Sequence, residues 1–420
     1  MNNNLGSFLK LKRIEKNIRQ DDLCRGICTP SYLSRIENNH VVADEEIYIL
    51  LLERLGIAYD QLLESIEHID EKIEKWYESL LNNELHQVNI EELKGLSVIG
   101  GGNTSFKFEI VYCRYLLEHD DLTEASKVLK NLKQIIKVAN NRTFFLFTNV
   151  LLLYYIKTDK FSEAVEAGVE LLQLVGYENL GDRFELGIFY YNFSLSLKNI
   201  YCYEEALIYI EKALKIFKDE YFLERALACH IILGTCFNNL RKWDDAIATY
   251  RLAERILIYL PKEVQNKYLY IISNNLGNCF EYQGKYNEAI NYYLEAIRYV
   301  NDDNKKTIQL NIIRTYYLKG DIESARRWLK SKQAEDDNRL SEKYQIQLKI
   351  FETITDHNLT IDNVMNIQKS SINYFLSIKD WKLTVRYSEL FANIYESYSH
   401  YKQANLLYKL ALQTNQNRRE

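Results

Sequence analysis

Apolar residues recur with a helical period along almost the whole chain. Leu5, Phe8 and Leu9 already have the i, i+3, i+4 spacing of a single helix face, and similar spacing continues toward the C-terminus. The chain of 420 residues contains only 2 Pro and 15 Gly, the residues that most often interrupt helices and strands. The pattern predicts an all-α protein with short connections.

Four short helices are predicted in the first sixty residues. The apolar spacing and the end signals place them at residues 5–16, 20–27, 30–38 and 44–56. Thr29 is a suitable N-cap for the third helix, and Pro30 fits its first position. The acidic run from Asp44 suits the positive end of the fourth helix. A sharp turn between the second and third helices predicts a helix-turn-helix domain over residues 1–65.

The motifs "RQDDL", "SYLSRIENN" and "LLERLGI" carry a family resemblance. The chain resembles the helix-turn-helix domains of phage repressors from residue 5 to residue 64. In such domains the third helix enters the major groove of DNA. The resemblance therefore implies base contacts from Ser31, Tyr32 and Arg35, with Thr29 near the groove.

The same resemblance implies two further roles in this domain. Gln20 matches the glutamine with which the family holds a DNA phosphate. Arg13 and Glu37 match a pair that forms an internal salt bridge, so we interpret both as structural.

Charge supports a nucleic-acid interface in this segment. The chain as a whole has a net charge of −5, yet residues 8–35 contain more Lys and Arg than Asp and Glu. Basic side chains bind phosphates and fix orientation without reading sequence. The candidate phosphate partners are Lys10, Lys12, Arg19 and Arg25.

From about residue 104 the chain repeats itself. A small residue recurs roughly every 40 positions, which is the period of a helical repeat array. It occupies positions Ala125, Ala164, Ala206, Ala246, Ala289, Ala325 and Ala404. The interval between Ala325 and Ala404 is about two periods long, which places one further unit near residue 365.

Two copies of the repeat resemble the tetratricopeptide repeat: "LGTCFNNLRKWDDAIATYRLAERI" and "LGNCFEYQGKYNEAINYYLEAIRY". The resemblance implies a right-handed α-solenoid with a concave inner surface over residues 104–420, joined to the first domain by connecting helices at 66–103. The intervals exceed the roughly 34 residues of that family, so the helices or the turns must be longer here.

In this family the first helix of each pair lines the concave side, which assigns candidate ligand contacts. The candidates are Asn149, Asn192, Thr235, Asn238, Asn239, Asn274, Asn278, Asn311 and Arg314. A carboxamide both donates and accepts, so a row of asparagines can pair with an extended peptide backbone. In the opposing interpretation these asparagines have no function. The chain is rich in Asn throughout, and AT-rich coding alone produces such a bias.

The whole layout resembles the peptide-pheromone-responsive transcriptional regulators of Gram-positive bacteria and their phages and plasmids. The resemblance implies a sequence-specific regulator that binds double-stranded DNA at a palindromic operator as a homodimer. It also implies that a short signalling peptide binds the repeats and changes DNA binding through the solenoid. Two alternatives remain: a repeat scaffold that sequesters a partner protein, and a constitutive regulator without a ligand.

Other classes of function lack support in the sequence. No phosphate-binding loop, zinc-protease helix or nucleophile elbow occurs, and Cys24 and Cys28 have no nearby second pair for a zinc site. We therefore expect no catalytic residues, no metal and no cofactor. The N-terminus lacks the apolar core of a signal peptide, and the seven cysteines are scattered. These features predict a cytoplasmic protein that does not associate with membranes.

Overall fold

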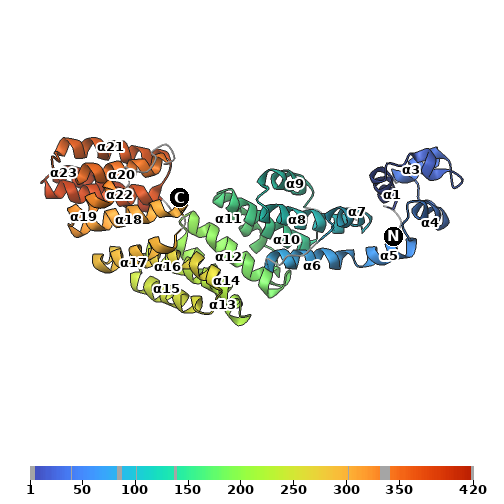
Figure 1. Cartoon of the computed structure of the whole chain (residues 1–420), viewed down its shortest axis with the longest axis horizontal. Helices are drawn as coiled ribbons and strands as arrows, with labels where there is room; N and C mark the ends of the chain where they lie inside the picture. Colours follow the sequence, from blue (N-terminus) through green and yellow to red (C-terminus); the bar gives the residue numbers. More distant parts are fainter. Residues whose placement is uncertain are drawn as a thin grey trace. The chain divides into compact units, whose positions relative to one another are not determined.

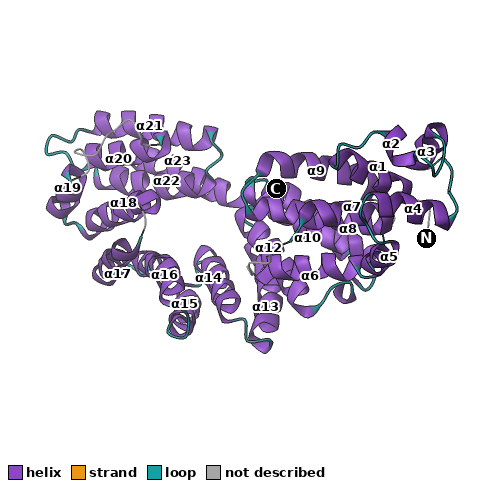
Figure 2. Ribbon diagram, turned by 45° about the vertical axis from the view of Figure 1, so that its right-hand side comes forward, coloured by secondary structure: helices purple, strands orange, loops and turns teal. Residues whose placement is uncertain are grey.

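The computed structural model describes residues 5–38, 40–82, 88–100, 102–136, 140–300, 302–331 and 341–417. Within these ranges the chain forms helices joined by turns and loops, and no strand (Figure 2). The prediction of an all-α protein is confirmed. The chain divides into two compact units, residues 1–186 and 187–420, which are described separately.

Five short helices form the N-terminal head of the first unit (Figure 1). They are α1 (Leu5–Glu15), α2 (Gln20–Cys24), α3 (Pro30–Glu37), α4 (Glu45–Arg54) and α5 (Tyr59–Glu67). Leu9, Leu23, Leu33 and Leu51 come from four of these helices and are completely buried, so they form the centre of the head. The apolar spacing therefore identified the core of this domain as well as its helices.

The second helix is shorter than predicted, ending at Cys24 and not near Ile27. Gly26 adopts a positive φ of 78°, which no residue in a right-handed helix has. The guanidinium of Arg54, at the end of α4, donates a 3.0 Å hydrogen bond to the carbonyl of Leu23 and a second bond to that of Arg25. Arg54 thereby satisfies carbonyls that a longer helix would have paired.

The connecting segment contains α6 (Ile69–Asn82) and α7 (Ile90–Gly100). Helix α7 packs directly against α1 of the head, where Gly95 permits a close approach: a methyl group there would lie 3.3 Å from Leu11. Buried residues of the head, the connecting helices and the first repeats belong to one continuous core. The head is thus fixed to the connecting helices by packing.

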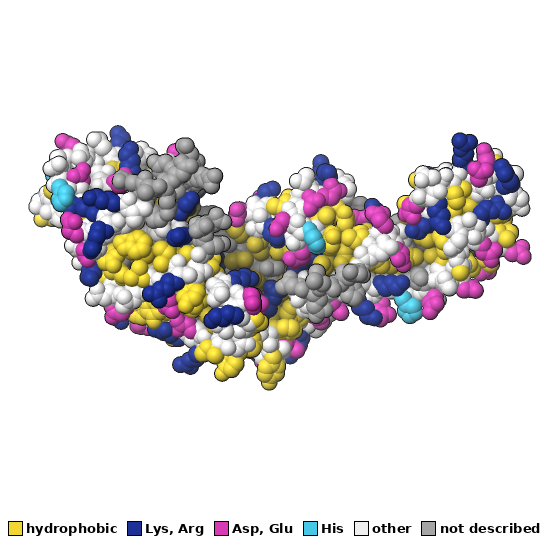
Figure 3. Space-filling view, viewed as in Figure 1, with side chains coloured by type: hydrophobic (Ala, Val, Ile, Leu, Met, Phe, Trp, Pro, Cys, Tyr) yellow, Lys and Arg dark blue, Asp and Glu magenta, His cyan; other side chains and the backbone are white. Residues whose placement is uncertain are grey.

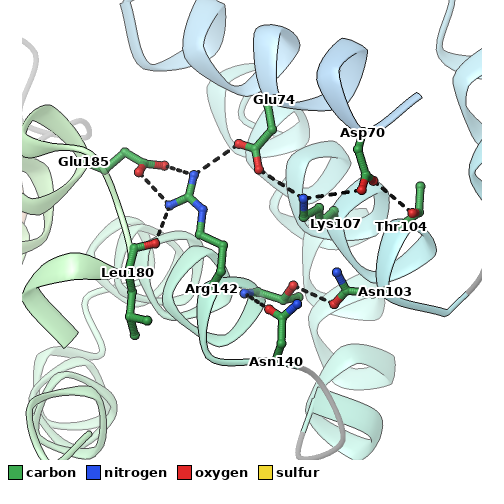
Figure 4. Close-up of polar contacts among 10 residues, drawn as sticks. Asp70, Glu74, Asn103, Thr104, Lys107, Asn140, Arg142, Leu180 and Glu185 are labelled. Carbon is green, nitrogen blue, oxygen red and sulfur yellow. Dashed lines mark hydrogen bonds and ion pairs between the residues drawn. The ribbon is translucent and has the colours of Figure 1, made fainter. Parts of the chain in front are cut away.

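Two hairpins of the repeat domain complete the first unit, α8 (Gly102–Glu118) with α9 (Leu122–Ile135) and α10 (Asn141–Lys157) with α11 (Phe161–Leu172). A polar network fixes α6 against them (Figure 4). Arg142 of α10 donates to Glu185 at 2.6 and 2.8 Å and to Glu74 of α6 at 3.1 Å. Lys107 of α8 lies 3.3 Å from the same Glu74. A single carboxylate on α6 therefore contacts cations from two repeat helices.

The division between the units falls within α12 (Arg183–Asn199), and the second unit holds the remaining helices. They are α13 (Tyr203–Asp219), α14 (Leu223–Asn239), α15 (Trp243–Leu257), α16 (Lys262–Tyr282), α17 (Tyr286–Tyr299), α18 (Asp302–Lys319), α19 (Ile322–Lys330), α20 (Glu342–Ile354), α21 (Ile361–Ser377), α22 (Trp381–Ser397) and α23 (Tyr401–Asn417). The extra length of the repeat lies in the helices, because α14 has 17 residues and α16 has 21.

The repeating alanine marks the contact between the helices of each pair. It is the fourth residue of α9, α11, α13, α15, α17, α19 and α23, and all seven alanines are buried. The unit predicted near residue 365 is the pair α20 and α21. Val364 stands at the fourth position of α21 and is completely buried. This copy lacks the repeating alanine because valine takes its place.

Two glycines allow tyrosines to pack between paired helices. A methyl group on Gly234 would lie 2.7 Å from the ring of Tyr250, and one on Gly277 would lie 2.7 Å from the ring of Tyr293. Both tyrosines are buried. The glycines of the two "LG" motifs are therefore required by close packing.

We expect Gly277→Ala to lower the free energy of unfolding by up to about 2 kcal/mol, because an overpacking cost of roughly 1–3 kcal/mol is offset by a gain of only about 1 kcal/mol in helix propensity. Urea unfolding followed by circular dichroism measures the change. The double variant Gly277→Ala with Tyr293→Leu is the control, since removal of the ring should abolish the extra cost of the methyl group. A more stable single variant would show that propensity dominates.

Candidate functional site

The third helix presents its N-terminal side chains at the surface of the head. Thr29 is its N-cap, and the hydroxyl accepts a 3.3 Å hydrogen bond from the backbone N–H of Tyr32. Ser31 and Arg35 are exposed. The Arg35 guanidinium lies over the Tyr32 ring, 5.6 Å from its centroid. Ser31 and Tyr32 therefore lie in the first turn of a capped helix, and Arg35 lies one turn further along the same face.

Glu37, the last residue of α3, is buried at the centre of a polar cluster. It accepts hydrogen bonds from Arg13 at 2.6 and 2.9 Å and from Gln20 at 2.7 Å. The hydrogen bond to Glu37 raises the pKa of Arg13. The predicted pair of Arg13 and Glu37 is present. Gln20, predicted to hold a DNA phosphate, instead donates to Glu37. Its N–H group donates inward, so a DNA phosphate would have to compete with a buried carboxylate for it.

The remaining predicted phosphate contacts lie on the outside of the head. Lys10 donates to Asn38 at 2.9 Å, Lys12 pairs with Glu15 at 2.8 Å, and Arg25 lies 3.4 Å from Asp22. Arg19 is exposed at the N-cap of α2. Figure 3 shows basic and acidic side chains interspersed on the visible face of the head. Such exposed pairs are weak, so these cations can exchange their partners for phosphates.

The predicted asparagine row forms pairs between neighbouring repeats. Asn238 of α14 donates to Asn278 of α16 at 2.8 Å, and Asn311 of α18 donates to Asn274 of α16 at 2.9 Å. The sequence placed these residues at equivalent positions but gave no reason to pair them. Part of their hydrogen-bonding capacity is therefore used to join successive first helices.

Other members of the predicted set differ in their exposure. Asn149 and Asn192 are buried, and the Asn149 carboxamide has no hydrogen-bond partner within the described part of the chain. Thr235 donates to the carbonyl of Ile231 at 2.8 Å, and Asn239 donates to the carbonyl of Thr235 at 2.7 Å. The structure thus does not bring all of the predicted contacts to one accessible surface.

The structure contradicts the ligand contact predicted for Arg314. Its guanidinium is buried and donates to Glu281 at 2.8 and 3.0 Å, and the Thr315 hydroxyl donates to the same carboxylate at 2.6 Å. Burial alone would raise the pKa of Glu281, but the positive charge of Arg314 keeps it below its usual range. The pair therefore stabilises the fold at neutral pH, and this stabilisation is lost as the pH falls through the pKa of Glu281.

A cavity of about 250 Å³ in the second unit contains two of the predicted residues. The segment from α14 to α16 contributes Asn238, Asn239, Arg241, Trp243 and Tyr282, and α22 contributes Lys382, Val385, Arg386 and Glu389. Sequence reasoning missed the α22 residues, because no spacing rule relates them to α14. The two sides meet through an ion pair of 3.2 Å between Arg241 and Glu389 and a 2.9 Å hydrogen bond from Arg386 to the Tyr282 hydroxyl.

The described ranges contain no cluster of three or more side chains able to hold a metal ion, and the cysteines there are free thiols. None of the helices in these ranges combines the length and the apolar character needed to cross a lipid bilayer.

Comparison with known proteins identifies both parts of the chain. A helix-turn-helix family model matches residues 9–62, and a tetratricopeptide-repeat model matches residues 272–303. The transcriptional activator NprA of Geobacillus stearothermophilus is 25% identical over 401 residues, which cover 92% of this chain and 97% of that protein. The predicted helix-turn-helix head and tetratricopeptide-like repeats are thereby confirmed.

Solved structures show the same fold. The apo form of the quorum sensor NprR from B. thuringiensis matches with a TM-score of 0.65 and 17% identity, covering 83% of this chain and 99% of that one. NprR in complex with its cognate peptide NprX matches with a TM-score of 0.60 and 18% identity, covering 82% of this chain and 98% of that one.

We expect Arg314→Ala to destabilise the protein by about 3–5 kcal/mol, because it leaves the Glu281 carboxylate buried without its counter-ion. Thermal and urea unfolding provide the measurement. Arg241→Ala is the matched control: the Arg241 side chain is 66% exposed, so its ion pair should contribute no more than about 1 kcal/mol. Equal stability losses in the two variants would contradict a structural role for the buried pair.

Proposed function

We propose that this chain, which belongs to the class of helix-turn-helix proteins with tetratricopeptide-like repeats, is a sequence-specific transcriptional regulator controlled by a short peptide. The observation that carries the proposal is one face of α3, where Ser31 and Tyr32 of the first turn lie beside Arg35 of the last turn, on a head packed against the connecting helices. A similar protein along nearly the whole chain is named a transcriptional activator, which supports the proposal.

The head reads DNA through α3 in this proposal. Arg35 pairs with a guanine edge in the major groove, while Ser31, Tyr32 and Thr29 contact neighbouring bases. Lys10, Lys12, Arg19 and Arg25 bind phosphates, and Gln20 contributes mainly by holding Glu37. A homodimer places two heads on the halves of a palindromic operator, as expected for a helix-turn-helix regulator.

The repeat domain binds the peptide. Its proposed contacts are Asn238, Asn239, Asn274, Asn278 and Asn311. Four of them already form carboxamide pairs, Asn238 with Asn278 and Asn311 with Asn274, of the kind that an extended peptide backbone makes. One matching solved structure is a complex of the quorum sensor NprR with a peptide, which supports a peptide as the ligand class. We assign no enzymatic activity and place the protein in the cytoplasm, where it meets DNA.

Selection of binding sites from random double-stranded DNA, with and without short peptides encoded beside the gene, tests this function. We expect a palindromic sequence whose occupancy changes with one peptide. A palindrome that is indifferent to every peptide would favour a constitutive regulator, or a scaffold that binds a protein partner. No selected sequence at all would contradict the proposed DNA function.

Arg35→Ala should weaken binding to the selected site by roughly 5- to 150-fold, corresponding to about 1–3 kcal/mol for a lost bidentate base contact. Its affinity for scrambled DNA should change little, so the ratio of the two affinities should fall by a similar factor. Fluorescence anisotropy at fixed salt concentration measures both affinities. Arg25→Ala serves as the control, because loss of a phosphate contact should weaken binding to both sequences by a similar factor. The same response from both variants would exclude base reading by Arg35.

A further inference from the structure

The cavity between the α14–α16 segment and α22 has an unusual excess of positive charge. Arg241 and Arg386 line it, and Glu389 is the one acidic side chain among its described lining residues. The nearby Glu281 does not remove this excess, since its carboxylate already accepts hydrogen bonds from Arg314. The cavity therefore has the electrostatic character of a site for an anionic group.

One wall of the cavity is aromatic and holds one of the cations in place. The rings of Trp243 and Tyr282 are stacked, with an interplanar angle of 5° and centroids 6.3 Å apart. The Arg386 guanidinium lies 5.7 Å from the Tyr282 centroid and also donates to its hydroxyl. Stacking and hydrogen bonding leave Arg386 with less freedom than an ordinary surface arginine, which favours binding of a planar anion.

Two polar atoms at the cavity have unused hydrogen-bonding capacity. The indole Nε1 of Trp243 and the Oδ1 of Asn238 are buried and have no partner among the described residues. The first is a donor and the second an acceptor, so a peptide carbonyl and a peptide N–H are their complementary partners, and contact with them requires a movement of Trp243 and Asn238 because neither atom is exposed. An inorganic anion would satisfy only the donor.

The ion pair between Arg241 and Glu389 is the part of this arrangement that a ligand can replace. Its side chains are 66% and 39% exposed, so the pair adds little to the stability of the fold. An incoming carboxylate can take the place of Glu389 beside Arg241 while Arg386 supplies the second cation. Carboxylates are good partners for arginine because both groups are planar and can form two parallel hydrogen bonds.

We propose that this cavity binds a carboxylate of the peptide ligand, between Arg241 and Arg386, and that the carboxylate displaces Glu389. This inference rests on the proposed function and specifies the ligand as an acidic peptide or one with a free C-terminus. The aromatic wall contacts the residue next to the carboxylate. Because Arg241 follows α14 and Glu389 lies on α22, the exchange also breaks a contact between repeats distant in sequence.

The test uses the full chain and random hexapeptide libraries in four forms. The libraries have either a free or an amidated C-terminus, and each is made with and without Asp and Glu. Affinity selection followed by mass spectrometry identifies the retained peptides, and anisotropy of labelled copies measures their affinity. We expect retention to require a carboxylate: loss on amidation identifies the C-terminus, and loss on omission of Asp and Glu identifies a side chain.

Variants then locate the site. Arg386→Gln should weaken the retained peptides at least tenfold, whereas Glu389→Gln should tighten them severalfold because it removes the competing carboxylate. The opposite signs distinguish the site from a general loss of folding. Lys349→Gln is the matched control, since Lys349 lines a separate cavity between α20 and α21.

The outcomes separate this inference from the function on which it rests. Peptides that bind equally well without any carboxylate, or that ignore both Arg386→Gln and Glu389→Gln, would overturn the carboxylate site and leave the peptide-controlled regulator standing. Retention of no peptide from any library would overturn both.

Discussion

Close approach of paired helices is the constraint on which the repeat domain depends. Each hairpin has an apolar face that it cannot bury alone, and stacking of neighbours buries it. A small or compact residue at the fourth position of the second helix permits this approach, from Ala125 in the first unit to Ala404 at the end of the second. Gly234 and Gly277 extend the same principle to the first helices, where they make room for Tyr250 and Tyr293. The asparagine pairs between successive first helices are a consequence of this stacking.

Charged residues have two distinct roles in the molecule, separated by burial. The pairs of Arg13 with Glu37 and of Arg314 with Glu281 are held by several hydrogen bonds within the protein. Removal of one partner from such a pair strands a desolvated charge, so these residues maintain the fold. Arg241 is exposed, so replacement of its contact with Glu389 by another carboxylate costs little free energy. Exposed cations on the head and at the cavity are therefore available to ligands, whereas the buried ones are not.

The head is not attached to the first repeats by a loose linker. Helix α1 packs on α7 at Gly95, and Glu74 of α6 contacts both Lys107 of α8 and Arg142 of α10. Burial and ion pairing therefore connect the DNA-reading domain to the first two hairpins within a single compact unit. A change in the packing of α10 has a direct physical route to α6, and from there to the helices that orient α3.

The sequence by itself determined the helices, the head and the repeat period, because helix capping and apolar periodicity are local properties. It also identified Thr29 as a cap from its place before Pro30, and family resemblance identified Arg13 and Glu37 as a pair. It failed where the environment of a side chain comes from distant segments. Arg54 at the end of α4 bonds the carbonyls at which α2 ends, and Arg314 is buried against Glu281 of a neighbouring helix. The cavity was beyond prediction for the same reason, since only tertiary folding brings Arg386 of α22 to Tyr282 of α16. Local pattern fixes which helices form, whereas burial and charge at each site depend on which helices meet.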